Sequence, residues 1–237
     1  MAKKFPPGRC IHCTRHFEEL TSDHVFPRSW YPDSTPEKME KWQVPACRKC
    51  NNEYGRLEEE LLLLLGVCLS NSAFASLGMG ARVVKAVDPS RGRNDRDENA
   101  RLNKGIKLVQ SFHPPVKGRP VMTLGGDPSG LAVSIPTKSL KRICEKIIRG
   151  TIYLHAERIL SDEHEVLCSA VPEAEDALFD LATKKFGATF DRGPGIEVTW
   201  ARDPERPPCG LFRVVLFGKY VLRGVVMPRE KMLPKHD

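Results

Sequence analysis

Two stretches of sequence decide how this chain begins to fold: CIHC at residues 10–13 and CRKC at residues 47–50. Each is a Cys-x-x-Cys knuckle, and together they supply the four thiolates that a closed tetrahedral zinc site requires. In a reducing compartment such pairs indicate metal binding more than disulfide bonds. His12 lies within the first knuckle and His16 three residues after it, and these two are the alternative ligands. We predict a structural Zn²⁺ ion bound by Cys10, Cys13, Cys47 and Cys50.

Residues 14–46 separate the knuckles, and this segment is longer than the usual loop of a zinc ribbon. This insert contains TSDHVFPRS at residues 21–29, and the second knuckle lies within VPACRKCNN at residues 44–52. The two stretches resemble the signature of the HNH endonucleases, also called the ββα-metal finger. In that family an Asp-His or His-His pair ends the first strand of a hairpin, and an Asn or His after the last knuckle cysteine begins a helix. The resemblance covers about residues 10–60 and says nothing about the rest of the chain.

The resemblance implies a role for three residues. Asp23 and Asn51 would bind one divalent cation, and His24 would act as the general base. Adjacent residues on a strand point to opposite faces, so Asp23 and His24 would serve different tasks. Carboxylate and amide oxygens suit Mg²⁺ or Mn²⁺. An imidazole, with an ordinary pKa of about 6.5, accepts a proton from water at neutral pH when a partner orients its other nitrogen.

The implied reaction is metal-dependent hydrolysis of a DNA phosphodiester bond, with RNA as the less favoured substrate. The cation would stabilise charge on the phosphorane and the leaving oxygen while His24 activates water. The products would carry a 5′ phosphate and a 3′ hydroxyl. Arg28, Arg48 and Lys49 lie close to the motif in sequence and would contact the flanking phosphates.

Two positions depart from the family pattern. A structural Asn usually braces the hairpin loop some nine positions before the last ligand, and Trp42 occupies that position here. Gln43 is the neighbouring amide that could replace it. Gly55 stands where some relatives carry a further His ligand, one helical turn after the first. The catalytic metal site would therefore have only two protein ligands.

Three alternatives stay open. Asn51 also suits the N-cap of a helix that begins near Glu53, because an Asn side chain accepts hydrogen bonds from free backbone amides. The finger could have kept its zinc and lost its reaction, which would leave a catalytically inactive nucleic-acid-binding or regulatory protein; Trp42 favours this reading. In the third alternative the knuckles brace a protein-interaction adaptor.

The chain of 237 residues is 41% hydrophobic and 28% charged, which is typical of a globular protein. Its formal charge of +7 and pI of about 9.0 suit a polyanionic partner. No run approaches the roughly 18 apolar residues of a membrane span. Because the first residues carry no apolar segment of a secretory signal, we expect a cytoplasmic protein without membrane contact.

We expect an α+β protein in two parts. Residues 1–60 would form the zinc-stapled finger, and residues 61–237 an accessory domain of helices and antiparallel sheet that positions substrate, binds a regulator or forms a homodimer. Polar sequence at 82–119 indicates a basic linker or surface loop. Periodicity predicts these elements: a helix from about Glu53, helices over 137–160 and 173–186, short strands over 121–124 and 131–135, and strands over 196–202 and 210–227.

Overall fold

The computed structural model describes residues 5–70, 72–116, 121–126, 130–170 and 176–229. Over these residues the chain is a mixed α+β protein with five α-helices and antiparallel sheets, which confirms the α+β part of the predicted fold class. None of the helices in the described ranges is both long enough and apolar enough to cross a membrane.

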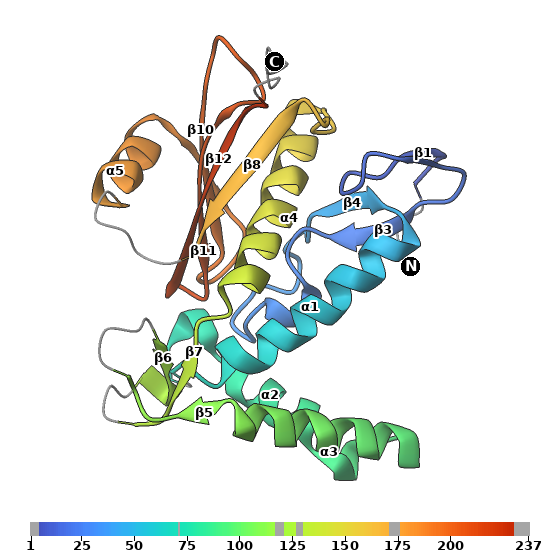
Figure 1. The fold of residues 1–237 in the computed structure, drawn as a ribbon, viewed down its shortest axis with the longest axis vertical. Coiled ribbons are helices and arrows are strands. Elements are labelled where there is room, and N and C mark those ends of the chain that lie inside the picture. The colour runs from blue at the N-terminus through green and yellow to red at the C-terminus, as the bar shows by residue number, and fades with distance from the viewer. Residues whose placement is uncertain (1–4, 71, 117–120, 127–129, 171–175, 230–237) are drawn as a thin grey trace, which may run out of the picture.

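A five-stranded antiparallel sheet forms the largest layer (Figure 1), with its strands in the order β8, β12, β11, β10, β9. Their bounds are β8 (His164–Ser169), β9 (Ala188–Asp191), β10 (Glu197–Arg202), β11 (Gly210–Leu216) and β12 (Tyr220–Pro228). The strands predicted over 196–202 and 210–227 are confirmed as β10, β11 and β12. The pattern does not predict β8 and β9, because polar residues interrupt their short apolar runs.

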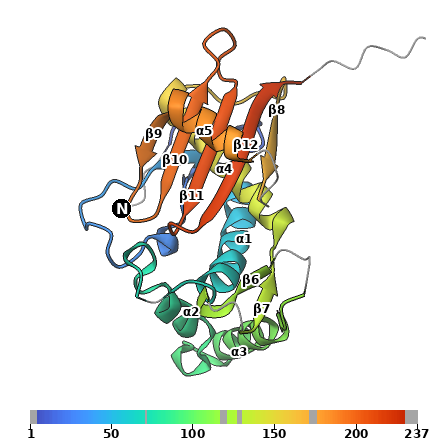
Figure 2. The same cartoon turned by 90° about the vertical axis from the view of Figure 1, so that its left-hand side faces the viewer.

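Helix α4 (Thr137–Ala156) covers one face of this sheet and α5 (Asp176–Phe186) lies on the other (Figure 2). Apolar residues recur along α4 at helical spacing, and Ile143 and Ile147 are fully buried against the sheet. The predicted helix over 137–160 is confirmed, although it ends where Glu157 takes a left-handed backbone conformation. α5 confirms the prediction over 176–186; residues 173–175 of that prediction lie outside the described residues.

The N-terminal part folds as two strands followed by a helix. β3 (Thr21–His24) pairs antiparallel with β4 (Gln43–Ala46), and α1 (Arg48–Gly66) comes directly after β4. A second short ribbon, made by β1 (Gly8–Arg9) and β2 (His16–Phe17), flanks the first knuckle. The β-β-α order that the resemblance implies is therefore present in this part of the chain.

Helix α1 begins at Arg48, earlier than the predicted start near Glu53. Its N-cap is Cys47, whose Sγ accepts a hydrogen bond from the backbone N–H of Cys50 at 3.4 Å. Because Asn51 lies inside the first turns of the helix, the alternative reading of Asn51 as the N-cap is wrong.

One large hydrophobic core runs through the described residues, beside two smaller clusters, one around the knuckle cysteines and one between α1, α2 and α3. The large core includes Trp30 between β3 and β4, Leu61 of α1, Ile147 of α4 and Phe212 of β11. The boundary predicted at residue 60 lies inside α1, which continues to Gly66. The N-terminal strands thus pack against the helix that covers the sheet.

The predicted basic linker or loop over 82–119 is wrong where the structure describes it, because this segment is largely helical. It contains most of α2 (Met79–Val87) and all of α3 (Asp95–Gln110). Asn94 caps α3 by accepting a hydrogen bond from the backbone N–H of Asp97 at 3.0 Å. Acidic residues occupy the first turn of α3, where their negative charge interacts favourably with the positive end of the helix dipole and stabilises the helix. The helix buries only Leu108, so its formation rests on local caps and charge more than on apolar periodicity.

A small antiparallel sheet follows α3 and has the strand order β5, β7, β6. β5 spans Phe112–His113, β6 spans Val121–Thr123 and β7 spans Ala132–Ser134. The short strands predicted over 121–124 and 131–135 are confirmed as β6 and β7.

Candidate metal centre and active site

The four knuckle cysteines converge, because the turn after β1 and the start of α1 lie side by side. Their sulfur atoms all lie within 4.8 Å of one another. The Sγ atoms of Cys13 and Cys47 are 3.9 Å apart, and a tetrahedral zinc ion holds its sulfur ligands about 3.8 Å apart. The cluster of Cys10, Cys13, Cys47 and Cys50 therefore fits a structural zinc ion.

The electrostatics of these thiols also favour a bound cation. Burial raises the pKa of Cys50 far above its usual range, and the nearby thiols Cys47 and Cys10 add to the rise. Burial also raises the pKa of Cys13, but hydrogen bonds from Arg15 and from other cysteines outweigh it and bring that pKa to about 7. A dication removes the repulsion between thiolates and stabilises their ionised form.

Strand β3 turns Asp23 and His24 to opposite faces. Asp23 is 4% exposed and faces the helices α1 and α4. Ser22 and His24 lie on the other face, where the Ser22 hydroxyl donates to Oε1 of Gln43 at 2.6 Å. The Gln43 amide thus braces the ribbon formed by β3 and β4, next to the position where the family pattern has an Asn.

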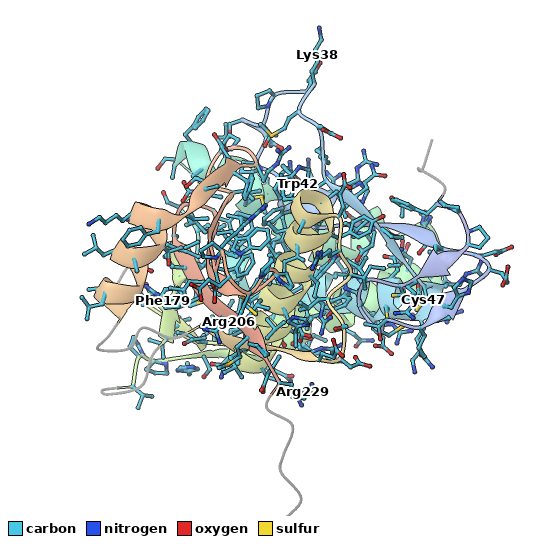
Figure 3. The ribbon with its side chains drawn as sticks, turned by 90° about the horizontal axis from the view of Figure 1, so that it is seen from above. Lys38, Trp42, Cys47, Phe179, Arg206 and Arg229 are labelled. Atoms are coloured by element: carbon cyan, nitrogen blue, oxygen red, sulfur yellow. The ribbon has the colours of Figure 1, made fainter. Side chains whose placement is uncertain are left out.

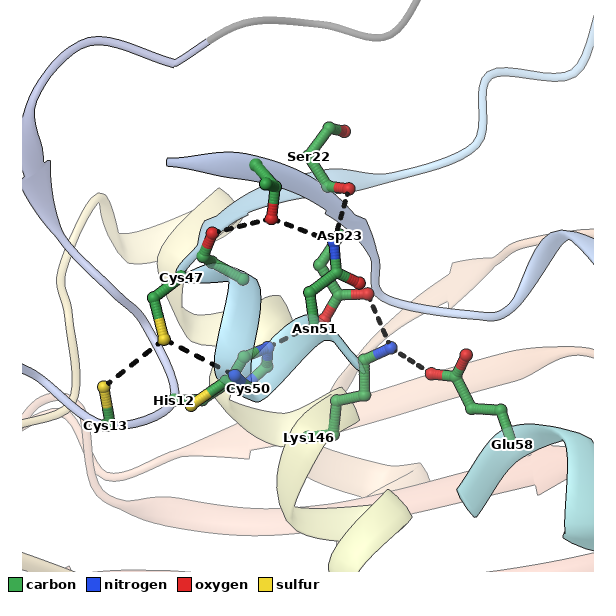
Figure 4. Close-up of polar contacts among 11 residues, drawn as sticks. His12, Cys13, Ser22, Asp23, Cys47, Cys50, Asn51, Glu58 and Lys146 are labelled. Carbon is green, nitrogen blue, oxygen red and sulfur yellow. Dashed lines mark hydrogen bonds and ion pairs between the residues drawn. The ribbon is translucent and has the colours of Figure 1, made fainter. Parts of the chain in front are cut away.

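Asp23 is the centre of a buried hydrogen-bond network (Figure 4). Nε2 of His12 donates to its Oδ2 at 2.8 Å, and Nζ of Lys146 donates to its Oδ1 at 2.9 Å. Lys146 belongs to α4, is 1% exposed and also donates to Glu58 of α1. The ring of Tyr54 packs against His12, with 4.6 Å between the ring centroids. His12, an alternative zinc ligand on sequence grounds, is therefore engaged by Asp23.

Burial and the neighbouring charged groups set the protonation states of Asp23, His12 and Glu58. Burial favours the neutral acid at Asp23, but the hydrogen bond from His12 and the charge of Lys146 outweigh it and lower the pKa of Asp23. Burial lowers the pKa of His12, although Asp23 opposes the change. Burial raises the pKa of Glu58 in spite of Lys146. Asp23 is thus ionised and His12 is a neutral donor at neutral pH.

Asn51 lies on α1 against the residues that precede Asp23. Its Nδ2 donates to Oγ1 of Thr21 at 2.9 Å and to the backbone carbonyl of Ser22 at 3.2 Å. These two bonds fix the orientation of the amide. Within the described part of the chain, its Oδ1 accepts no hydrogen bond and is available to a ligand.

The ring of His24 is half-buried and forms no hydrogen bond with the residues that the structure describes. Burial lowers the pKa of His24, and the charge of Arg28 lowers it further. The imidazole is therefore neutral at neutral pH, which is the form that accepts a proton.

The three cations predicted to contact phosphates are all exposed. Arg28 begins a short 3-10 turn, η1 (Arg28–Trp30), close to His24. Arg48 and Lys49 lie in the first turn of α1, and Nζ of Lys49 is 4.0 Å from Glu53. Their contact with phosphate stays a prediction.

Trp42 packs away from the candidate site. Its ring centroid lies 4.9 Å from that of His155 and 5.8 Å from that of Phe190. Figure 3 shows Trp42 next to the end of α4 that faces the viewer. The residue therefore joins β4 to α4 and β9, and this packing accounts for a large aromatic ring at the position.

Sequence reasoning missed three members of the network around Asp23: His12, Glu58 and Lys146. Lys146 did carry a signal, because it lies between Ile143 and Gly150 on the face of α4 that is otherwise apolar. A charged residue on a buried helix face must find a partner, but the identity of that partner cannot be read from helical spacing.

No protein-family model, curated protein or solved structure matches the chain. The resemblance seen in residues 10–60 therefore rests on short motifs. What these residues do must be argued from their geometry and chemistry.

Proposed function

We propose that this chain is a metal-dependent endonuclease of the HNH type that hydrolyses DNA. The observation that carries the proposal is the placement of Asp23, His24 and Asn51 on one β-β-α unit beside the four-cysteine cluster. A structural zinc would hold the two ends of this unit together. The residues that would bind a cation and activate water then lie on neighbouring positions of β3 and α1.

The acceptor atoms of the unit are compatible with a Mg²⁺ or Mn²⁺ ion. Each oxygen of Asp23 accepts one hydrogen bond, and a carboxylate oxygen has about two lone pairs. Oδ1 of Asn51 adds a neutral oxygen donor. When bound, the cation would supply charge stabilisation to a phosphate group. His24 would accept a proton from water, while His12 and Lys146 would keep Asp23 ionised and oriented.

The test is the nicking of supercoiled plasmid with Mg²⁺ or Mn²⁺ by the parent chain, His24→Ala and His16→Ala. His16 is an exposed histidine of β2 and serves as the matched control. We expect the parent and His16→Ala to nick the plasmid, and His24→Ala to lose at least roughly 100-fold in rate. Equal cutting by all three would point to a contaminating nuclease, and absence of cutting by all three would contradict the proposal.

One observation favours a second function, a zinc-stabilised nucleic-acid-binding protein without catalysis. The ammonium of Lys146 already neutralises Asp23, and it would repel a dication at the same carboxylate. Mn²⁺ binding, followed by the electron paramagnetic resonance signal of free Mn²⁺, separates the two functions. If the chain is a nuclease, it has a Mn²⁺ site that is weakened in Asp23→Asn and Asn51→Ala. If it only binds nucleic acid, the parent and both variants should show the same background binding of Mn²⁺.

A further inference from the structure

Four cations, from the segment around β3 and β4 and from the ends of β9 and β10, have no carboxylate partner in the described ranges. Arg28, Lys41, Arg192 and Arg202 form no ion pair with any acidic residue in the described ranges. The arginines on the opposite face of the sheet differ, since Arg213 and Arg223 both pair with Asp180 of α5. The positive charge of the four residues is therefore available to an external anion.

Three of these cations are held in place over aromatic rings. Nζ of Lys41 lies 5.1 Å from the ring centroid of Tyr31. Cζ of Arg192 lies 4.3 Å from the centroid of Trp42, and Cζ of Arg202 lies 4.0 Å from the centroid of Trp200. A cation that is already fixed loses less conformational entropy when it binds an anion.

Backbone carbonyls fix the two arginines further. Nη2 of Arg192 donates to the carbonyl of Glu40 at 2.6 Å, and Nη2 of Arg202 donates to the carbonyl of His155 at 3.1 Å. The first bond ties β9 and its following turn to the segment before β4, and the second ties β10 to the end of α4. Each bond uses one nitrogen of a guanidinium group that has five N–H donors. Nε of Arg192 is buried, and the remaining Nη donors are the ones that an anion can reach.

Chain positions and side-chain contacts link the four residues to His24 and to one another. Arg28 follows His24 by four residues. Lys41 precedes Trp42, whose backbone carbonyl accepts a hydrogen bond at 3.0 Å from the N–H of Val25, the residue after His24. Arg192 lies over the Trp42 ring, and its charge opposes the rise in the pKa of Tyr31, the ring beneath Lys41. The Trp42 ring contacts His155, which stacks on Phe190 with 3.9 Å between the ring centroids, and Arg202 donates to the carbonyl of His155. These links thus lead from the edge of β3, past Trp42, to β10.

We propose that these four cations form a cationic track that binds the phosphate backbone of duplex DNA and leads it to His24. The choice of DNA as the polyanion rests on the proposed nuclease function. The track gives residues 61–237 a role in substrate binding, because Arg192 and Arg202 belong to the five-stranded sheet and its turns. It also gives Trp42 a second role, since this ring supports Arg192.

The experiment measures binding of a fluorescein-labelled DNA duplex by anisotropy in EDTA, on a His24→Ala background, over a series of salt concentrations. The track variant carries Lys41→Gln, Arg192→Gln and Arg202→Gln. The matched control carries Lys138→Gln, Lys184→Gln and Lys185→Gln, which remove the same charge from exposed positions elsewhere. We expect the track variant to bind on the order of 100-fold more weakly at low salt, with the slope of log K against log salt smaller by about 0.9 for each lost contact. The control should change affinity by less than about 3-fold, because it removes no backbone contact.

Two further variants make the result independent of folding defects. Arg28→Gln alters an exposed side chain, and alone it should lower the slope by about 0.9. Arg192→Lys with Arg202→Lys keeps the charge and should keep the slope. Two results would overturn the track. One is an equal loss of binding in the track and control triples. The other is an unchanged salt slope in both the track triple and Arg28→Gln, which is the result expected if the true partner is an acidic protein. Plasmid nicking is a separate measurement, so the track and the nuclease function can fail independently.

Discussion

Lys146 is the residue on which the candidate site most depends. Its ammonium lies between the carboxylates of Asp23 and Glu58 and is almost fully buried. A buried charge that loses its partner costs several kcal/mol, because it keeps its desolvation penalty and loses the compensating attraction. The network therefore ties three segments together: β3, α1 and α4.

Replacing Lys146 by Met should destabilise the protein strongly. The change leaves two buried carboxylates without a cation, and we expect the free energy of unfolding in urea to fall by about 3 kcal/mol. Lys141→Met, an exposed position on the same helix, should change it by less than about 0.5 kcal/mol. Adding Glu58→Gln to Lys146→Met should recover part of the loss by removing one of the unpaired charges. Equal stability of Lys146→Met and Lys141→Met would show that the ion pairs contribute nothing.

The parts of the site that sequence can predict are the local ones. The four cysteines were predictable because their spacing within each knuckle fits a metal ion, and the cluster confirms that they meet. The roles of Asp23, His24 and Asn51 stay predictions that rest on a resemblance. Lys146 lies 123 residues from Asp23 along the chain, and no local pattern specifies a contact at that distance.

Among the helices, α4 approaches β3 closely at one point, and a glycine allows the approach. A Cβ atom built on Gly150 would lie 2.6 Å from Cγ2 of Val25, which is 1% exposed. Since Val25 follows β3 directly, this contact sets how near α4 comes to Asp23. The side chain of Lys146, one turn earlier on α4, reaches the carboxylate because of this close approach.

Gly150→Ala should therefore destabilise the protein, although Ala favours a helix over Gly. Overpacking against Val25 should cost about 1–3 kcal/mol in the free energy of unfolding, which exceeds the gain of about 1 kcal/mol in helix propensity. The matched control is Gly55→Ala on α1, where a Cβ meets nothing within 4 Å; this change should stabilise by about 0.5–1 kcal/mol. Both free energies of unfolding come from urea titrations. If Gly150→Ala stabilised the protein, α4 and the segment after β3 would have to lie farther apart than the structure shows.

Element prediction succeeded where burial creates a pattern and failed where it does not. α4 and the strands β10 to β12 are half-buried, so their apolar residues recur at helical or strand spacing. α3 buries only Leu108 and is held by its cap and its charges. Its polar composition therefore led to the incorrect prediction of a linker.

At the scale of the molecule, the large core joins residues next to the four-cysteine cluster to the five-stranded sheet, so we expect the two parts to unfold together. Ile11, between the first two cysteines, and Trp200 of β10 belong to one set of contacting buried residues. The cysteines lie in a smaller cluster of their own with Leu20 and Ala46, but Ile11 and helix α1 connect it to the main core, so we expect two-state unfolding. The predicted division into residues 1–60 and 61–237 would instead give two transitions.

We expect one zinc ion per chain and one cooperative thermal transition, in which zinc release and loss of near-ultraviolet circular dichroism coincide. The released metal can be followed with a chromogenic chelator, while the dichroism reports mainly on buried rings such as Trp200 and Phe212, stacked in the sheet. Because structural zinc contributes its binding free energy to folding, excess EDTA or Cys47→Ser should lower the melting temperature of the whole protein. Cys168→Ser, outside the cluster, is the control and should keep the zinc. If zinc leaves while the sheet keeps its dichroism and its melting temperature, the two parts fold independently, and the network from β3 through Lys146 to α4 does not couple them.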